Sequence, residues 1–543
     1  MTSTLYYGGP ILTMVSPTPA QALLVNEGII QAVGPREELE ALDPDARRID
    51  LQGCTLMPAF LDSHSHITAL AQTFALAPLE NARSFQDIHR LLKDFAQQIQ
   101  AKPEEWITGF GYDHNFLQEG RHPSRQLLDQ WFPSNPVLLS HASGHMGVVN
   151  SRALQAMGLT SDSPDPEGGL LGRDKDTGEL NGYLEETAFT VHAGRAVPRP
   201  SRHQLLRQLK MAEQVYLSHG ITTIQDGLTR TPQWELLLEA SQESVFQADI
   251  VAYADLKECP RLLREYPVHA EGYDHHLRLG GYKIFLDGSP QGRTAWMRQP
   301  YLGGEPDYRG YPIYGDGQVA DFFLTAYEEG RQLLVHCNGD AAAEQMIRAC
   351  QEVIGKRNSQ GLPIPDIRPV MIHAQLAAPD QFPAMAACSM IASFFPAHIY
   401  HWGDIHLKNF GQPRASQISA AGSALSCGLA FTFHQDTPVL PPNMLETLWC
   451  AVNRLTREGV SLDPGQAISP LEGLKAMTRT AAYQYHEENR KGSLAPGMLA
   501  DLVILSDNPL TVPAEELRRL EVLATLKEDV PVYQREKDLF FSS

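Results

Sequence analysis

The sequence has 543 residues, of which 43% are hydrophobic and 20% are charged, values typical of a globular protein. Its 44 lysines and arginines stand against 64 aspartates and glutamates, giving a formal net charge of −20. Such a surface repels phosphate backbones and anionic lipid, which excludes nucleic acid and membranes as expected partners. The seven cysteines form no C-x-x-C pair, so neither a thiolate zinc site nor a disulfide framework is expected.

The first residues lack the basic and apolar regions of a signal peptide, and no apolar run approaches the ~20 residues that span a bilayer. We therefore expect a cytoplasmic protein that acts on a small-molecule substrate. Homodimer formation is left open.

Short β segments are predicted at both ends of the chain. Residues 1–57 hold three apolar segments separated by glycine and asparagine turn signals, and residues 493–543 hold two more. Neither end has enough strands to bury a face alone. We therefore predict that the two ends form one small composite β-sandwich domain. Two unrelated edge hairpins are the alternative.

Between these ends, apolar runs alternate with helix-length segments. This pattern predicts a parallel sheet buried on both faces, in the α/β class. Together with the segments 57–66 and 106–112 there are eight candidate strands, the number that closes a (β/α)8 TIM barrel, which we place over residues 58–492. A stretch rich in Pro, Gly, Asp and Ser predicts an elaborated insertion around residues 114–215. The other six apolar runs cover residues 221–226, 282–287, 333–338, 369–374, 390–395 and 429–436.

Polar residues interrupt or end several of these strands. Alternate residues of an extended chain share a face, so His64 and His66 are expected to point the same way. A single histidine at a strand end is more often a core residue than a ligand, but imidazoles and carboxylates that converge at one barrel mouth are ligands for zinc. The joint pattern predicts a divalent metal site, most simply zinc. Its residues are His64, His66, Lys283, His336, His373 and Asp436.

Several motifs together resemble the amidohydrolase superfamily. They are "FLDSHSH", "HCNGDAA", "VMIHAQ", "HQDTPV" and "KGSLAPGMLADLVIL". Two further motifs, "KIFLDGSPQGRTAWM" and "SGHMGVVNSRAL", resemble its family 3 branch, which contains N-substituted formamide deformylases.

This resemblance implies a role for each predicted ligand. His64 and His66 would hold one metal, His336 and His373 a second, and Asp436 would bind metal beside the attacking water. Lys283, in the fourth candidate strand, matches the position of a carbamylated lysine that bridges two metals. An unmodified Lys283 paired with Asp287 or bound to substrate is the alternative, and the site would hold one or two ions.

The resemblance also implies a reaction. We expect hydrolysis of a non-peptide carbon–nitrogen bond, in an amide or an N-acyl or N-formyl amine, with Asp436 as the base and Lys283 as a catalytic metal ligand. One alternative is another metal-assisted reaction on the same scaffold, such as deamination, ester hydrolysis or decarboxylation. The other is a non-catalytic regulatory relative, against which the retention of every ligand position argues.

Four other histidines are candidates for contact with substrate. His141 and His145 lie in "HASGHMGVVN", where a structural role within the insertion is the alternative. His398 and His401 lie in "AHIYHWGDIH", for which a polar loop at the barrel mouth is the simpler interpretation. His434 departs from the smaller residue that the resemblance leads us to expect there.

Overall fold

The computed structural model describes residues 3–142, 146–166, 169–197, 200–303, 305–536 and 539–541. The chain divides into two compact units. The first, called here the barrel unit, comprises Met1–Leu70 and Leu209–Ser543. The second, called the inserted unit, comprises Ala71–Gln208.

Eight parallel strands form the central sheet of the barrel unit. In spatial and chain order they are β6 (Phe60–Leu61), β13 (Ile221–Thr229), β14 (Asp249–Asp255), β15 (Leu277–Phe285), β16 (Gln332–Cys337), β17 (Val370–His373), β18 (Ile391–Phe394) and β19 (Phe431–Phe433). The sheet curls until its first and last strands meet. Just beyond β6, the Ser63 hydroxyl donates to the Phe433 carbonyl at 2.8 Å, and the His66 N–H donates to the Thr437 carbonyl at 2.8 Å.

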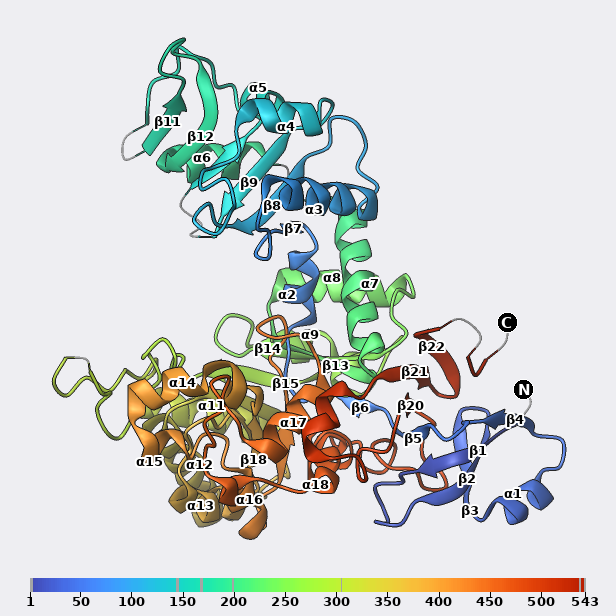
Figure 1. Ribbon diagram of the computed structural model, residues 1–543. Coiled ribbons are helices and arrows are strands. Elements are labelled where there is room, and N and C mark those ends of the chain that lie inside the picture. Colours follow the sequence, from blue (N-terminus) through green and yellow to red (C-terminus); the bar gives the residue numbers. More distant parts are fainter. Residues whose placement is uncertain are drawn as a thin grey trace. The chain divides into compact units, whose positions relative to one another are not determined.

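Helices follow most of these strands and bury one apolar face each (Figure 1). In α12, acidic Asp340 in the first turn and basic Lys356 and Arg357 in the last turn complement the helix dipole. No helix in the described part of the chain is both long and apolar enough to cross a membrane. The main helices of the unit are α8 (Thr231–Gln242), α11 (Asp316–Glu329), α12 (Asp340–Ser359), α13 (Phe382–Ala387), α14 (Ala397–Phe410), α16 (Ala421–Ser426), α17 (Met444–Asn453), α18 (Pro470–Ala476) and α19 (Arg479–Gln484).

One predicted barrel strand is wrong. The segment 106–112 forms β8 (Ile107–Tyr112), which pairs with β7 (Ala77–Pro78) and β9 (Val137–His141) in the inserted unit. The barrel position is filled instead by β14, which the sequence analysis missed. A buried parallel strand has the same apolar pattern in any sheet, so the pattern does not show to which sheet a strand belongs.

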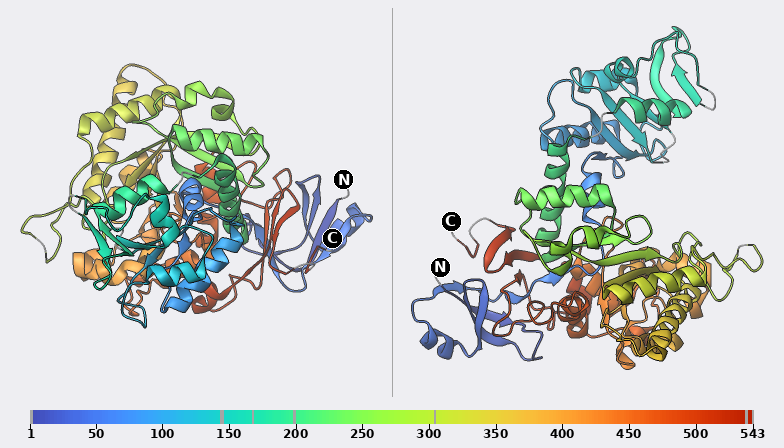
Figure 2. Two further views of the ribbon diagram at one scale, coloured as in Figure 1. Left: turned by 90° about the horizontal axis from the view of Figure 1, so that it is seen from above. Right: turned by 180° about the vertical axis from the view of Figure 1, so that it is seen from behind.

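Strands from both ends of the chain pair in one further sheet. It has eight strands in the order β22-β21-β20-β5-β1-β2-β3, with β4 paired to β1. The two ends meet where β5 runs antiparallel to β20, and Figure 2 shows the N-terminal and C-terminal strands side by side. Tyr6, Leu56, Ile504 and Leu526 share its core. The sandwich form of this domain stays a prediction. The bounds are β1 (Thr4–Ile11), β2 (Ala20–Asn26), β3 (Ile29–Gly34), β4 (Arg47–Asp50), β5 (Thr55–Pro58), β20 (Leu502–Leu505), β21 (Val522–Lys527) and β22 (Val530–Gln534), with α1 (Arg36–Leu42) beside β2.

The inserted unit has its own six-stranded sheet, in the order β11-β12-β10-β9-β8-β7. Its core includes Ile88, Leu92, Leu128 and Leu139, contributed by two helices and a strand. The unit includes β7 and β8, which lie upstream of the predicted limits of the insertion. The remaining bounds are α3 (Phe85–Gln98), α4 (Arg125–Trp131), β10 (Met146–Val149), α5 (Ser151–Ala156), β11 (Gly169–Arg173), β12 (Leu180–Glu186) and α6 (Thr187–Ala196), while α2 (Ile67–Thr73) and α7 (Arg202–Ser218) join the two units along the chain.

A buried ion cluster ties the terminal sheet to the barrel. Asp249, the first residue of β14, lies 2.5 Å from the Lys491 ammonium and 2.9 Å from the Lys527 ammonium. The Lys527 ammonium also lies 2.9 Å from a carboxylate oxygen of Asp501. Burial alone would raise the pKa of Asp249, but the two ammonium groups outweigh it and hold that pKa well below its usual range. Asp249 is therefore ionised at neutral pH.

We predict that Lys527→Met lowers the free energy of unfolding by about 3 kcal/mol, because it removes the ammonium that pairs with the buried Asp501 and one of the two that pair with Asp249. Arg519→Met is the matched control, since its ion pair with Glu516 is exposed and should contribute less than about 1 kcal/mol. Chemical denaturation of both variants measures the difference. Equal losses would show that the cluster does not stabilise the junction.

Candidate metal site at the carboxyl end of the barrel

The predicted ligands all lie at one end of the barrel sheet. His64 and His66 follow β6, and Asp436 follows β19. The others lie within β15, β16 and β17, each near the carboxyl end of its strand. Because these ends of parallel strands gather at one mouth, residues far apart in the sequence come together there. The structure connects them through short contacts into two groups.

The first group consists of two imidazoles and one carboxylate. Asp436 Oδ1 lies 3.1 Å from His66 Nε2 and 3.5 Å from His64 Nε2. The ligand atoms of the three residues all lie within 4.8 Å of one another. Among the described residues, Asp436 Oδ1 is buried and meets no donor in hydrogen-bonding geometry. A buried carboxylate oxygen without a partner is costly, and a divalent cation between it and the two imidazoles would satisfy it.

Lys283 is fully buried beside this group. Its ammonium nitrogen lies 3.2 Å from His64 Nε2, and burial lowers its pKa to about 7. The alternative partner, Asp287, is occupied elsewhere and makes no ion pair with Lys283 in the described structure. Its carboxylate accepts hydrogen bonds from the backbone N–H groups of Trp296, Asn338 and Gly339. Burial therefore lowers the pKa of Lys283 against the opposing effect of the nearby Asp436 carboxylate, and about half of the amine is neutral at pH 7.

The second group is a row of three histidines. His336 Nδ1 lies 3.1 Å from His373 Nε2, and His373 Nδ1 lies 3.1 Å from His434 Nε2. His434 Nδ1 lies 2.9 Å from the Ser393 hydroxyl. Burial lowers the pKa of His336 to about 4 and that of His434 to about 3. These imidazoles are neutral at pH 7, which is the form that binds metal.

Two residues that the sequence analysis did not assign to the metal site orient these rings. The Nδ1–H of His64 contacts the Gln225 side-chain oxygen at 2.6 Å, which leaves Nε2 free to act as a ligand. Gln225 is itself fixed, because its amide donates to the Ser63 carbonyl and the Tyr485 hydroxyl, each at 2.9 Å. His434 is the second. Its place two residues before Asp436, like that of His64 before His66, is the signal that could have found it.

Backbone strain coincides with the site. His373 has a φ of 71° and Asp436 has a φ of 55°, a left-handed region that side-chain-bearing residues rarely adopt. Such conformations persist where the surrounding structure fixes them, and they cluster at functional sites.

The other substrate-contact candidates lie in two places. The segment with His398 and His401 is not a loop but helix α14, because its buried residues, which include Gly403 and His406, recur at helical spacing. His398 Nδ1 lies 3.2 Å from His406 Nε2, and His401 Nε2 lies 3.3 Å from the Glu446 carboxylate. His141 lies in the inserted unit, and His145 falls outside the described residues. Contact of these histidines with substrate stays a prediction.

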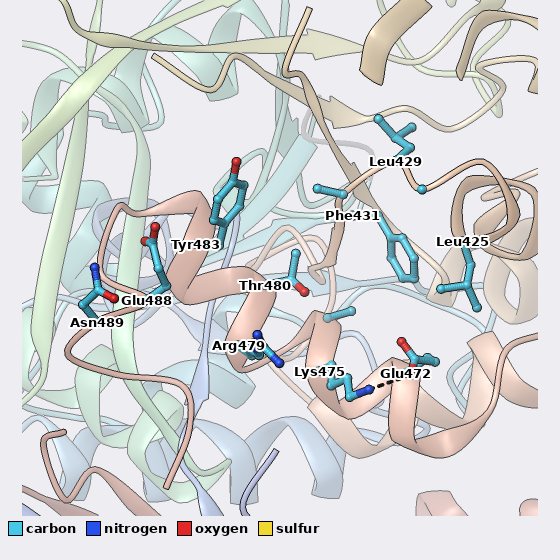
Figure 3. Close-up of a pocket in the computed structure, with 13 residues that line it drawn as sticks. Leu425, Leu429, Phe431, Glu472, Lys475, Arg479, Thr480, Tyr483, Glu488 and Asn489 are labelled. Carbon is cyan, nitrogen blue, oxygen red and sulfur yellow. Dashed lines mark hydrogen bonds and ion pairs between the residues drawn. The ribbon is translucent and has the colours of Figure 1, made fainter. Parts of the chain in front are cut away.

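A surface hollow lies at the other end of the last barrel strand. Phe431, the first residue of β19, lines it together with α18 and α19, as Figure 3 shows. Its charged residues are partly paired, since Lys475 donates to Glu472 at 2.8 Å. Asp436 follows the opposite end of the same strand. The hollow is therefore not part of the candidate metal site.

Comparison with known proteins identifies the family. Residues 47–533 match the sequence pattern of the amidohydrolase family. The chain belongs to this family. It is 28% identical to the N-substituted formamide deformylase of Arthrobacter pascens, over 95% of both chains, and 26% identical to the putative amidohydrolase YtcJ of Bacillus subtilis, over 98% of this chain and 99% of the relative.

A solved structure agrees on the fold. The crystal structure of an uncharacterized metal-dependent hydrolase from Pyrococcus furiosus superposes with a TM-score of 0.73 and 23% identity, covering 94% of this chain and all of the other. Amidohydrolase structures of this kind have a TIM-barrel-like fold, which agrees with the curled parallel sheet described above. The motifs that resembled this superfamily were therefore correctly assigned.

We predict that Lys283→Met stabilises the metal-free protein at pH 7. The folded-state pKa of about 7 lies below the ordinary lysine value of 10.5, so the folded protein binds fewer protons than the unfolded chain and its free energy of unfolding rises with pH between these two values. The gain from the substitution should be on the order of 3 kcal/mol at pH 7 and shrink toward pH 10. Thermal unfolding after chelation measures it, with exposed Lys408→Met as the control. A pH-independent difference would contradict the buried neutral amine.

Proposed function

We propose that this amidohydrolase uses a divalent metal to hydrolyse a non-peptide carbon–nitrogen bond in an amide or an N-acyl or N-formyl amine. The observation that carries the proposal is the buried Asp436 Oδ1, which meets no donor in hydrogen-bonding geometry among the described residues and lies 3.5 Å from His64 Nε2 and 3.1 Å from His66 Nε2. The relationship to the N-substituted formamide deformylase supports the choice of bond. Nitrogen and oxygen ligands without thiolates suit zinc.

The two groups of side chains would hold one or two ions. His64, His66 and Asp436 form the first ligand set, and His336 with His373 forms the second. Lys283, 3.2 Å from His64, would bridge the two sets as a carbamate. Carbamylation joins the neutral amine nitrogen to carbon dioxide with loss of one proton. The lowered pKa of Lys283 favours it, because only the neutral amine carries the attacking electron pair.

Asp436 is placed to move the proton. When bound, a divalent ion acts as a Lewis acid that acidifies water and polarises the scissile carbonyl. Burial would raise the pKa of Asp436, but the neighbouring His66 outweighs it and lowers that pKa below its usual value. The carboxylate is therefore ionised at neutral pH. It can accept a proton from the attacking water and pass it to the leaving nitrogen.

His434 and Ser393 hold the ring of the predicted ligand His373 in place. His434 Nε2 contacts His373 Nδ1 at 3.1 Å, which fixes the ring, while His373 Nε2 faces His336 Nδ1 and is the nitrogen left to act as a ligand. Ser393 anchors the end of the row. We assign His434 a positioning role, because it acts on the ligand His373 and not on the reacting atoms.

We predict that Asp436→Asn lowers kcat by about 10²- to 10⁴-fold while the fold and most of the metal are retained. The asparagine keeps the size and one oxygen but cannot accept the proton. Turnover is measured on a panel of formamides, N-acyl amines, cyclic amides, esters and aminated heterocycles, which also separates amide hydrolysis from the other reactions of this scaffold. Asp380→Asn, at an exposed ion pair with Arg298, is the control. Activity of the Asp436 variant within a few-fold of wild type would rule out this base.

A second prediction concerns the metal itself. The double variant His64→Ala/His66→Ala should contain at least one equivalent of metal fewer than the wild type and lose turnover, because it removes two ligands of the first set. Elemental analysis and circular dichroism test metal content and folding. His219→Ala is the control, since its ring contacts the Val215 carbonyl of its own helix. Undiminished metal in the double variant would refute the ligand assignment.

A further inference from the structure

A second cluster of ligand side chains lies in the inserted unit and shares no residue with the proposed metal site of the barrel. Asp113 and His114 follow β8 directly, and His141 is the last residue of β9. These two strands are parallel neighbours, with Tyr112 paired to His141 in register. The three side chains therefore come from the carboxyl ends of adjacent strands, at one edge of the six-stranded sheet.

The distances among their ligand atoms are informative. His114 Nδ1 lies 3.3 Å from His141 Nε2, His141 Nε2 lies 3.4 Å from Asp113 Oδ1, and His114 Nδ1 lies 3.8 Å from the same oxygen. The two histidine–aspartate distances exceed the roughly 2.7–3.2 Å of an ordinary N–H···O hydrogen bond, and the His114–His141 contact is a long N–H···N hydrogen bond. A tetrahedral zinc ion with bonds of about 2.1 Å separates its ligand atoms by roughly 3.4 Å. The triangle thus fits an ion better than it fits mutual hydrogen bonding.

The surroundings hold the cluster in place and leave it accessible. Asp113 Oδ1 accepts the backbone N–H of Asn115 at 2.9 Å, which fixes the carboxylate. The His141 side chain is 9% exposed, whereas those of Asp113 and His114 are 25% and 29% exposed, so an ion can enter from solvent. The His122 ring packs 4.1 Å from the His114 ring, between centroids, and its Nδ1 lies 3.0 Å from the Tyr112 hydroxyl. This packing restricts rotation of the His114 ring.

We propose that Asp113, His114 and His141 bind a divalent transition-metal ion of the zinc type, in addition to the barrel site. Two imidazole nitrogens and one carboxylate oxygen are ligands that zinc, cobalt and nickel share. Three protein ligands leave one position of a tetrahedral ion for water or another small ligand. Because the ligands come from two strands, the ion would also link the ends of β8 and β9 and stabilise the inserted unit.

The test counts zinc in the full-length protein. Wild type and variants are stripped with a chelator, reloaded with Zn²⁺, passed through gel filtration and analysed for bound metal. The double variant His114→Ala/His141→Ala should bind one equivalent fewer than wild type, and reloading should raise its Tm less. His89→Ala, in the same unit but stacked on Trp131, should bind as much as wild type. Equal zinc in the His114/His141 and His89 variants would overturn the proposal.

Two further variants keep the result decisive. The barrel variant His64→Ala/His66→Ala should still lose one equivalent when His114→Ala/His141→Ala is added, so failure at one site is distinguishable from failure at the other. Should the double substitution unfold the inserted unit, Asp113→Asn removes charge with little change in shape. It should weaken the Zn²⁺ affinity of one class of sites by about tenfold or more, measured by competition with a chromogenic chelator. An unchanged affinity would overturn the proposal.

Discussion

The structure depends on the burial of ionisable side chains at the carboxyl ends of the barrel strands. The amine of Lys283 and several imidazoles lie there almost without solvent, and the Asp436 side chain is only 15% exposed, so an unpaired charge is expensive. The chain reduces the cost of burial by placing acidic and basic side chains in contact and by favouring the neutral forms of others. The carboxylate of Asp436 lies against two imidazoles, the amine of Lys283 tends to the neutral form, and the imidazoles share contacts in a row. A divalent cation is the component that would satisfy the remaining oxygen.

The same constraint explains what the sequence could and could not predict. The ligand positions were predictable because barrel strands are apolar, so that a histidine or lysine within one stands out, as Lys283 does in "YKIFLD". Gln225 and His434 were not assigned to the site, because Gln225 lies within an apolar run and His434 precedes the more obvious ligand Asp436. The orientation of the His64 ring depends on Gln225, and that contact joins residues from two different strands.

The fold was predictable in kind but not in every strand. The alternation of apolar runs with helices correctly indicated a parallel sheet of eight strands, yet β8 was placed in it and β14 was omitted. Both segments are apolar and follow or precede a helix. β8 and β14 differ in the strands with which they pair. Strand pairing joins residues far apart in the sequence, so the local sequence pattern does not show it. The six-stranded sheet of the inserted unit was not foreseen for the same reason.

The pairing of β5 with β20 has a consequence for how the chain is made. During synthesis β5 emerges first, and its partner leaves the ribosome only after the whole barrel and inserted unit have been translated. Until then one edge of the N-terminal strands is open, as is the apolar surface of Tyr6 and Leu56 that the C-terminal strands later cover. This sheet can therefore be completed only after β20 has been synthesised, close to the end of translation. A nascent chain cut short anywhere before β20 would display an unpaired strand edge, which is the kind of surface that chaperones and proteases act upon.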